Sequence, residues 1–473
     1  MAKVLTPAER LALGQQRRKQ MPRVDHAKWD GKARKVSPLK LMEASMRGRV
    51  PPLVTLKYER MAASPFGFFR GAVPVMAYDL SLVGNTGLDC QLCGDAHVRN
   101  LGAFAAPDGR LVFDINDFDE TIAAPFEWDV KRMAASLVVA GREIGAKDVR
   151  CFEAARLFLE SYRTSLLEFA RMPVLEVARY QVHRLQSATT IEGVFRLAER
   201  ATPLHTLLTL TEPSDRKAAA QEKLTVASAK STKTTLEKAA RKVVVEGRTR
   251  IFKSNPPVLT RLTGAIVGKV IASLGPYTKS LQPERQKFLA QYRPVDVAFK
   301  VVGTGSVGLR DYCVYMEGNG ARDPLFLQIK EEVESGYAPY VKTRQIPHQG
   351  QRVVQGERAM QLQSDPFLGW TTLEGRQYLV RQLNDHKASI EVAALKAAGL
   401  MEYAQVCGEL LARGHARSGD CLELAGYLGN STRFDNAVVM FAEAYANQTE
   451  ADWKLLVASM KKAGRKAGRA SGR

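Results

Sequence analysis

Cys93-Gly-Asp-Ala-His-Val-Arg-Asn100 is the stretch on which the interpretation of this chain depends. In it, Asp95 precedes Asn100 by five positions. That spacing is typical of a loop in which a carboxylate accepts the proton of a substrate hydroxyl and an asparagine holds a magnesium ion. The stretch therefore predicts a phosphoryl-transfer site, with Asp95 as the base and Asn100 as a metal ligand.

A second acidic group follows in Phe113-Asp-Ile-Asn-Asp-Phe-Asp-Glu120. Magnesium prefers hard oxygen ligands and is commonly bound through one or two carboxylates. We expect Asp117 to bind it, because Asp117 directly follows a predicted strand at 111–116, and Asp119 to assist or to bind a second metal ion. Asp114 is expected within the strand. The alternative is a cluster of solvated turn acids, but the alternation of apolar and acidic residues in this run argues against it.

A glycine-rich segment comes more than 180 residues later, where Gly303, Gly305 and Gly308 surround Ser306 between two predicted strands. Without Cβ atoms, such a hairpin lets backbone N–H groups close over phosphates. Lys330 ends an apolar strand 22 residues beyond the last of these glycines. A lysine on a strand at this point is expected to pair with the α- and β-phosphates of a nucleotide. The alternative is a tight hairpin followed by a surface lysine.

Apolar periodicity divides the chain into a β-rich segment between two helical ones. Strands are predicted at 297–302, 312–316, 325–329 and 378–382, with a hairpin turn at Asn319-Gly320. A helix is predicted at 349–363, and helical spacing marks most of 130–290 and 388–460. The predicted fold class is α+β. We divide the chain into an N-terminal arm, catalytic loop and helices (1–290), a β-rich part with the glycine loop and lysine (291–385), and helices with a basic tail (386–473).

The motifs resemble those of a known superfamily. Cys93–Asn100 resembles the His-Gly-Asp-x-His-x-x-Asn loop of the aminoglycoside and choline phosphotransferase branch of the protein-kinase-like superfamily. Asp117-Phe-Asp119 resembles the metal motif of that branch, and Asp129 resembles an aspartate that braces its catalytic loop. More closely, several stretches are similar to an uncharacterised bacterial family, a domain of unknown function within that superfamily: 60–71, 93–100, 113–132, 303–308 and 350–370. The resemblance implies a phosphotransferase that uses ATP and magnesium. Cys93 departs from the pattern, since it replaces a histidine that is mainly a structural brace.

The order of the motifs is reversed relative to a kinase, in which the glycine loop and lysine come first. The resemblance therefore implies a circularly permuted two-lobe fold, with a small β-rich lobe at 296–384, a hinge at 382–385 and a large, mainly helical lobe. A helix at 400–417 is expected to take the place of the one that normally precedes the catalytic loop. Glu357, on the predicted helix 349–363, is our choice for the glutamate that pairs with Lys330.

The amino-acid composition narrows the classes of binding partner that are expected. The formal net charge is +20 and the sequence pI is about 9.7, with Lys and Arg concentrated near both ends and in 216–253. This favours polyanionic partners. Nucleic acid is less favoured than a nucleotide, because no aromatic residues are interleaved with the basic ones to stack bases. No apolar run approaches the roughly 20 residues of a membrane span. With a polar N-terminus and six cysteines, a cytoplasmic protein is expected, and Cys90 and Cys93 are interpreted as buried thiols rather than a metal pair.

Several alternatives stay open at this point. The acceptor is unidentified and is either a small molecule or a protein. A kinase-fold AMP transferase is a second enzymatic hypothesis, and a non-catalytic scaffold that binds nucleotides or anions is a third. Arg60 and Arg70 flank Ser64-Pro-Phe-Gly-Phe-Phe69. They either clamp a phosphate or acceptor, as arginine readily does, or tie this segment to the core. His97 is expected to brace the loop by hydrogen bonding.

Overall fold

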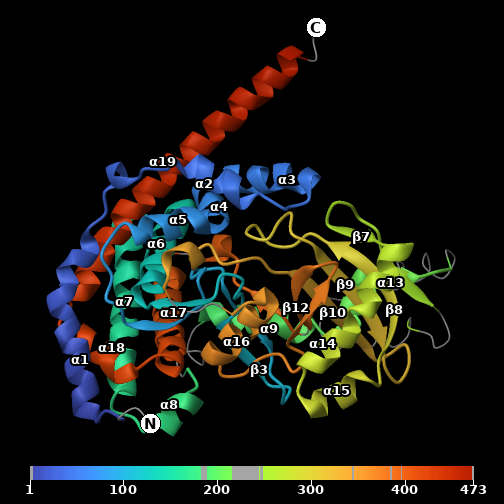
Figure 1. Cartoon of the computed structure of the whole chain (residues 1–473), viewed down its shortest axis with the longest axis horizontal. Helices are drawn as coiled ribbons and strands as arrows, with labels where there is room; N and C mark the ends of the chain where they lie inside the picture. Colours follow the sequence, from blue (N-terminus) through green and yellow to red (C-terminus); the bar gives the residue numbers. More distant parts are fainter. Residues whose placement is uncertain are drawn as a thin grey trace.

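The computed structural model describes residues 4–182, 189–215, 244, 249–342, 346–383, 386–395 and 397–470. Most of the basic segment 216–253 and two residues of the predicted hinge, Asn384 and Asp385, lie outside this set. The fold is mixed α+β, as predicted, with most of the long helices on one side and the largest sheet, with the shorter helices α13, α14 and α15 beside it, on the other (Figure 1).

Long helices build the helical side. The principal ones are α1 (Pro7–Gln20), α6 (Glu127–Glu143), α7 (Asp148–Phe169), α17 (Ala397–Ser418), α18 (Cys421–Leu428) and α19 (Arg433–Ala470). Helix α7 shows why they form: Cys151, Ala154, Phe158, Tyr162 and Leu166 recur at helical spacing and are all buried. The predicted helix 400–417 is confirmed as part of α17. It packs along α7, which lies far away in the sequence.

Shorter helices precede and follow this group. The N-terminal ones are α2 (Pro38–Ser45), α3 (Pro51–Ala62), α4 (Pro65–Gly71) and α5 (Val73–Ser81). The central ones are α8 (Val174–Arg179), α9 (Thr189–Arg200), α10 (Pro203–Leu210), α13 (Ala265–Ala272), α14 (Leu274–Ser280), α15 (Pro283–Leu289) and α16 (Gln349–Met360). Proline occupies the first turn of α2, α3, α4 and α5, where its missing N–H has no intrahelical acceptor to lose.

An antiparallel six-stranded sheet forms the other side. Its order is β11 (Gly369–Leu373), β12 (Arg376–Gln382), β10 (Pro324–Glu331), β9 (Asp311–Glu317), β8 (Arg293–Lys300) and β7 (Leu259–Arg261). The four strands predicted in this part of the chain are confirmed, as is the turn at Asn319-Gly320 between β9 and β10. Central strands β9 and β10 are buried throughout, because α13 and α14 pack on one face while α10 and β6 (Arg250–Phe252) pack on the other.

Small sheets position the two acidic motifs. Strand β1 (Asp89–Leu92) pairs with β4 (Ile122–Pro125), and β3 (Leu111–Ile115) pairs with β2 (Leu101–Ala105), which in turn pairs with β13 (Ala388–Ser389). Strands β5 (Thr211–Pro213) and β6 form a separate pair. The strand predicted at 111–116 is confirmed as β3. The predicted helical stretch from 388 begins instead with β13 and becomes α-helical at α17.

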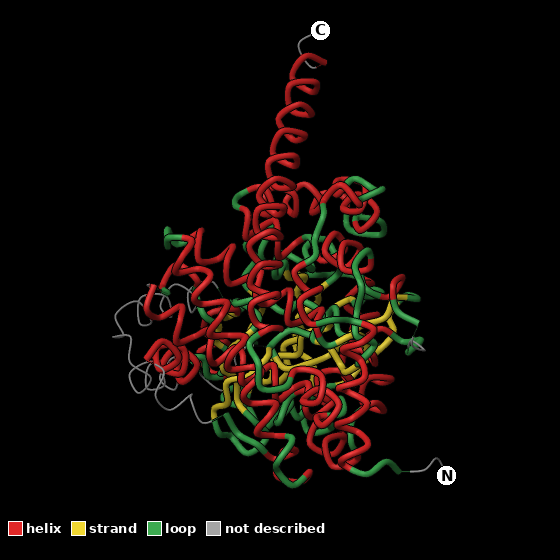
Figure 2. Tube along the Cα trace, turned by 90° about the vertical axis from the view of Figure 1, so that its left-hand side faces the viewer, coloured by secondary structure: helices red, strands yellow, loops and turns green. Residues whose placement is uncertain are grey.

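One core joins the two ends of the chain. Its buried residues come from 66–198 and from 337–446, so that Phe126, Tyr162, Tyr403 and Tyr427 belong to the same cluster. Helix α19 continues past its last buried residue, Leu456, and projects away from the body (Figures 1 and 2). Among the described residues, no helix is long and apolar enough to cross a membrane.

Candidate functional site

The acidic motifs and the glycine loop meet at one cavity of about 320 Å³. Its lining includes most of the residues singled out from the sequence: Asp95, Asn100, Asp117, Asp119, Gly303, Gly305, Ser306 and Lys330. Gly308 borders a smaller adjoining pocket, and Glu357 borders another that does not include Lys330. Residues that are more than 180 positions apart thus face a common space.

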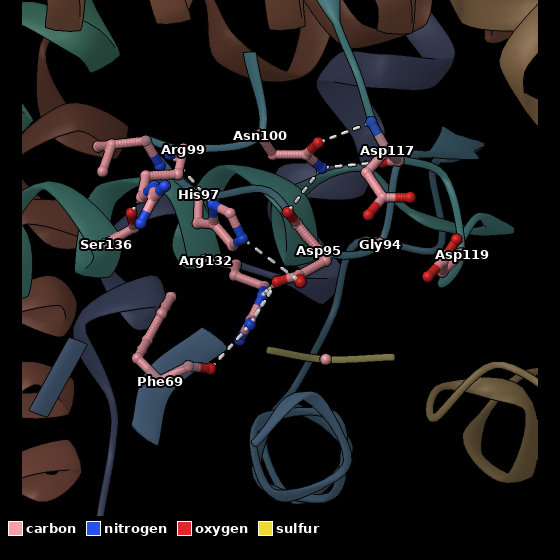
Figure 3. A network of polar contacts seen from close by, with 12 residues as sticks. Phe69, Gly94, Asp95, His97, Arg99, Asn100, Asp117, Asp119, Arg132 and Ser136 are labelled. Carbon is pink, nitrogen blue, oxygen red and sulfur yellow. Dashed lines mark hydrogen bonds and ion pairs between the residues drawn. The ribbon is translucent and has the colours of Figure 1, made fainter. Parts of the chain in front are cut away.

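Asp95 is held by Arg132, which lies fully buried on α6. Arg132 Nε and Nη2 donate to Asp95 Oδ1 at 2.8 and 2.5 Å, and Nη2 also donates to the carbonyl oxygen of Phe69 at 3.0 Å (Figure 3). Burial raises the pKa of Asp95, but the charges and hydrogen bonds of Arg132 and His97 together outweigh burial and hold the pKa well below its ordinary value. Asp95 is therefore an ionised acceptor that points into the cavity.

His97 contacts the same carboxylate. The backbone N–H of Arg99 donates to His97 Nδ1 at 3.1 Å, and His97 Nε2 lies 3.5 Å from Asp95 Oδ2 (Figure 3). Burial lowers the pKa of His97 and favours the neutral ring. Because Nδ1 accepts a hydrogen bond, the proton of the neutral ring is on Nε2, toward Asp95. His97 thus orients the carboxylate, in agreement with the brace expected for it.

Asp129 fixes the start of the catalytic loop. Its carboxylate accepts the backbone N–H groups of Cys93 at 2.8 Å and Gly94 at 3.0 Å, and His415 Nε2 lies 3.5 Å away. The side chain is fully buried at the first turn of α6, so these contacts replace the water it has lost. This is the bracing geometry that the resemblance implied for Asp129. Cys90 and Cys93 are buried free thiols, and burial raises the pKa of both.

Asn100 joins the two acidic motifs. Its Nδ2 donates to the carbonyl oxygens of Asp95 at 2.9 Å and Asp117 at 2.8 Å, while its Oδ1 accepts the backbone N–H of Asp117 at 2.7 Å (Figure 3). The amide therefore closes the loop onto the end of β3. One lone pair of Oδ1 is used in this way, and the second is the one available to a metal ion.

Asp117 and Asp119 share one ammonium group. Lys330 Nζ lies 3.3 Å from Asp117 Oδ1 and donates to both carboxylate oxygens of Asp119. The Lys330 side chain is only 3% exposed, whereas that of Asp117 is 48% exposed. Burial raises the pKa of Asp117, but the charges of Lys330, Arg381 and Lys387 and a hydrogen bond with Asp119 together outweigh burial and hold the pKa well below its ordinary value. Burial and the neighbouring Asp117 charge raise the pKa of Asp119, because one ammonium cannot fully compensate two carboxylates.

The glycine loop is held by side chains of α3 and of the turn before it. Lys57 Nζ donates to the carbonyl oxygen of Gly305, Arg60 Nη1 to that of Gly303 at 2.6 Å, and Arg49 Nη1 to that of Val307 at 2.6 Å. These three bonds engage loop carbonyls. At its end, Gly308 has φ +91°, a conformation that side-chain-bearing residues rarely adopt. Arg60 therefore ties its segment to the loop, while Arg70 lines the cavity.

Glu357 is not the partner of Lys330. Helix α16 places it in the pocket beside Phe104 and Asn116, where its buried Oε2 has no hydrogen bond to any of the described residues. Burial raises the pKa of Glu357 to about 7 against the opposing charges of Arg381 and Lys387. The position beside Lys330 is occupied by the acids of the second motif, which the loop after β3 brings closer than α16 brings Glu357.

Sequence reasoning missed Arg132 and Lys57. A signal for Arg132 was present: it follows Asp129 by three positions on a predicted helix, so both side chains share one helix face toward the catalytic loop. Lys57 carried no local signal, since its acceptor Gly305 lies 248 positions away.

The donor set suits magnesium better than a transition metal. Within the described ranges, no group of three or more His, Cys, Asp or Glu side chains could hold a metal ion. Asp117, Asp119 and the amide oxygen of Asn100 supply hard oxygen atoms at the cavity wall. Such a small set fits Mg²⁺, which keeps several waters and binds through one or two carboxylates together with substrate phosphates.

Fold and site together define an α+β protein with a charged cavity between its large sheet and its helical core. The chain belongs to the DUF2252 family, described as an uncharacterized protein conserved in bacteria, whose family profile matches residues 49–459. The bacterial family of unknown function expected from the motifs is thus confirmed. No curated protein and no solved structure matches the chain.

Proposed function

We propose that this protein is a Mg-ATP-dependent phosphotransferase with a circularly permuted, kinase-like arrangement. One observation carries the proposal: Asp95, Asn100 and Asp117 line the same cavity as the glycine loop and Lys330, although the two groups are far apart in the sequence. Each is a residue type that phosphoryl transfer requires, and a scaffold that only binds anions has no need of the acidic members.

The proposed roles follow from the contacts. The ammonium of Lys330 pairs with the α- and β-phosphates, and the N–H groups of the glycine loop close over the triphosphate. A magnesium ion bound by Asp117, Asp119 and Asn100 would neutralise phosphate charge. Asp95, held by Arg132 and His97, orients the acceptor hydroxyl and receives its proton. Because its pKa is low, Asp95 takes the proton late, once the hydroxyl oxygen has begun to bond to phosphorus.

In this proposal the six-stranded sheet with α16 is the small lobe, and the core around α6, α7 and α17 is the large lobe. The cavity between them is consistent with this assignment. Lys330 on β10 comes after the catalytic loop in the sequence, whereas the unpermuted order would place it before. The connection between β12 and β13 is the proposed hinge.

The nucleotide site is tested by calorimetric titration of ATP with magnesium into the wild type, Asp117→Asn and Asp108→Asn. Asp108 lies in the exposed β2–β3 turn, where it pairs with Arg110, so it receives the same chemical change outside the cavity. We expect Asp108→Asn to bind like the wild type and Asp117→Asn to bind at least about 10-fold more weakly, because it loses one metal-binding carboxylate. Thermal melts confirm that each variant is folded.

Equal affinity of wild type and Asp117→Asn, or no binding by either, would contradict the proposal. Nucleotide binding without magnesium dependence, together with binding of nucleic acid that falls steeply with salt, would favour the scaffold. If the nucleotide is turned over, the mass of the modified acceptor distinguishes a phosphotransferase from an AMP transferase. A phosphoryl group adds about 80 Da, and an AMP group adds far more.

A further inference from the structure

The walls of the cavity carry more positive than negative charge. Eight basic and five acidic side chains line it. Nucleotide phosphates and a metal ion would account for Lys330 and the acids of the second motif. The question is which basic side chains are left for another ligand, and where they lie relative to Asp95.

Most of the basic side chains are already engaged by protein. Lys57 and Arg49 bind carbonyl oxygens of the glycine loop. Arg381 binds Gln328 Oε1 at 3.1 Å and a backbone carbonyl at 3.2 Å, and Arg99 pairs with Glu391 at 3.0 Å in an exposed contact. These engaged groups add to the potential of the cavity, but they have fewer donors to offer an incoming molecule.

Arg70 is different. Within the described part of the chain, its guanidinium makes no hydrogen bond and no ion pair, and its Nε is buried without an acceptor. Burial lowers the pKa of Arg70, and the nearby charge of Arg99 lowers it further, while Asp95 and Asp117 act in the opposite direction. A buried donor without an acceptor is unfavourable, and a guanidinium is best satisfied by the two oxygens of a carboxylate or phosphate.

The backbone fixes Arg70 beside the catalytic loop. It lies in the last turn of helix α4 next to Phe69, whose carbonyl oxygen accepts from the same Arg132 nitrogen that holds Asp95 (Figure 3). Arg99 lies in the catalytic loop itself, one position before Asn100. Two basic side chains from different elements thus line the cavity together with Asp95.

We propose that the acceptor is an anionic hydroxyl compound, whose carboxylate or phosphate is bound by Arg70, with Arg99 beside it. This rests on the proposed phosphotransferase activity and specifies its substrate class. The acceptor hydroxyl oxygen forms a bond to the γ-phosphorus as the bond from that phosphorus to the β,γ-bridging oxygen breaks. Its proton passes to Asp95, and the products are a phosphate ester and ADP. A cationic acceptor such as an aminoglycoside or choline would be repelled by the same charges.

The test uses four probes built on one skeleton: glycerol 3-phosphate, glycerate, glycerol and 3-amino-1,2-propanediol. Each is titrated calorimetrically into full-length protein saturated with magnesium and a non-hydrolysable ATP analogue. The variants are Arg70→Gln, Arg70→Lys and, as a matched control at an exposed turn, Arg110→Gln. We expect the two anionic probes to bind wild type and Arg110→Gln. Arg70→Gln should weaken that binding at least about 10-fold, and Arg70→Lys should restore part of it.

The nucleotide analogue is titrated into each variant first, so that nucleotide binding and acceptor binding are tested separately. Unchanged nucleotide affinity with a selective loss of the anionic probes in Arg70→Gln supports the acceptor class. With nucleotide affinity unchanged, any of three results overturns the acceptor class. The anionic probes bind no better than glycerol, they bind Arg70→Gln as well as wild type, or they bind more weakly than the amine. No nucleotide binding by the wild type overturns the phosphotransferase and the acceptor together.

Discussion

Arg132 determines what Asp95 can do. Its side chain is fully buried, and its guanidinium is shared among the Asp95 carboxylate, the Phe69 carbonyl oxygen and the Phe69 ring, which lies 4.3 Å from it. The same residue therefore positions the carboxylate, keeps it ionised and links the catalytic loop to α4. The position of Asp95 in the cavity depends on a contact between α6 and this loop rather than on the loop sequence alone.

Replacing Arg132 by methionine is expected to destabilise the protein by about 2–4 kcal/mol. The partly buried Asp95 would lose its ion pair, and breaking such a pair from one side leaves an uncompensated charge. Urea denaturation measures this change. The double variant Arg132→Met with Asp95→Asn should recover part of the loss, because the unpaired charge is then absent. A single variant as stable as the wild type would contradict the prediction.

At this scale, the sequence was informative about residues that act through local spacing. Asp95, Asn100, Asp117 and Lys330 were found from short motifs and do line one cavity. Partners supplied by distant segments were not found, because no periodicity relates Lys57 to Gly305. The assignment of Glu357 to Lys330 was wrong for the same reason: which acid lies nearest a buried ammonium depends on how two distant elements pack.

Helix α16 illustrates how one element is fitted to its neighbours. It packs on β12, and Gly356 in its middle lies against Thr121, just before β4. A Cβ at Gly356 would lie 2.2 Å from Thr121 Oγ1, which is closer than real contacts allow. Thr121 Oγ1 also donates to the carbonyl oxygen of Leu92, so it is not free to move aside. The absence of a side chain at 356 therefore sets the approach of α16 to the loop that carries the acidic motifs.

A matched pair of substitutions tests this fit. Gly356→Ala is expected to destabilise by about 1–3 kcal/mol through overpacking. Gly268→Ala, the same change inside α13 where a Cβ meets nothing within 4 Å, is expected to stabilise by up to about 1 kcal/mol through helix propensity. Thermal or urea unfolding of both variants gives the comparison. If both substitutions change stability by a similar amount in the same direction, contact with Thr121 does not determine the effect of Gly356→Ala.

Elements with a strong pattern were predictable and those without one were not. The apolar runs of β9 and β10 gave both strands and their turn, and α16 and α17 followed from helical spacing. Strands β4 and β13 were missed because strands of four and two residues are too short to show a clear period. The partner of β1 could not be predicted, because β4 lies beyond a complete intervening hairpin and strand patterning alone does not specify such a partner.

At the scale of the molecule, the two ends of the chain are parts of one structure. Helix α17 contributes Leu400, Tyr403, Cys407 and Leu410 to the core that also contains α6 and α7. The grouping of helices from both ends was expected from motif order. The packing of α17 along α7 was not, since sequence periodicity identifies an apolar face but not its partner.

Truncation after residue 385 is therefore expected to prevent cooperative folding, although it leaves both acidic motifs and the glycine loop in place. Each large apolar side chain lost from the core removes roughly 1.5–3 kcal/mol of burial, and a domain has only about 5–15 kcal/mol of net stability. Near-UV circular dichroism and thermal melts measure the effect. Truncation after Lys462, which removes only the projecting end of α19, is the control and should change the melting temperature by a few degrees at most. A sharp melting transition in the shorter protein would contradict the prediction.

The ammonium of Lys330, shared between Asp117 and Asp119, has a thermodynamic consequence for a Mg-ATP enzyme. Magnesium arriving alone must compete with an internal cation for both carboxylates. A triphosphate arriving alone must draw that cation away and leave two carboxylates facing its own charge. Each ligand removes the obstacle that the other meets, so their binding free energies are coupled and the coupling is reciprocal, typically by about 5–150-fold in affinity. If the proposed Mg-ATP site is correct, the ion pair would make it respond to the metal–nucleotide complex as a unit and leave it poorly sensitive to either component alone.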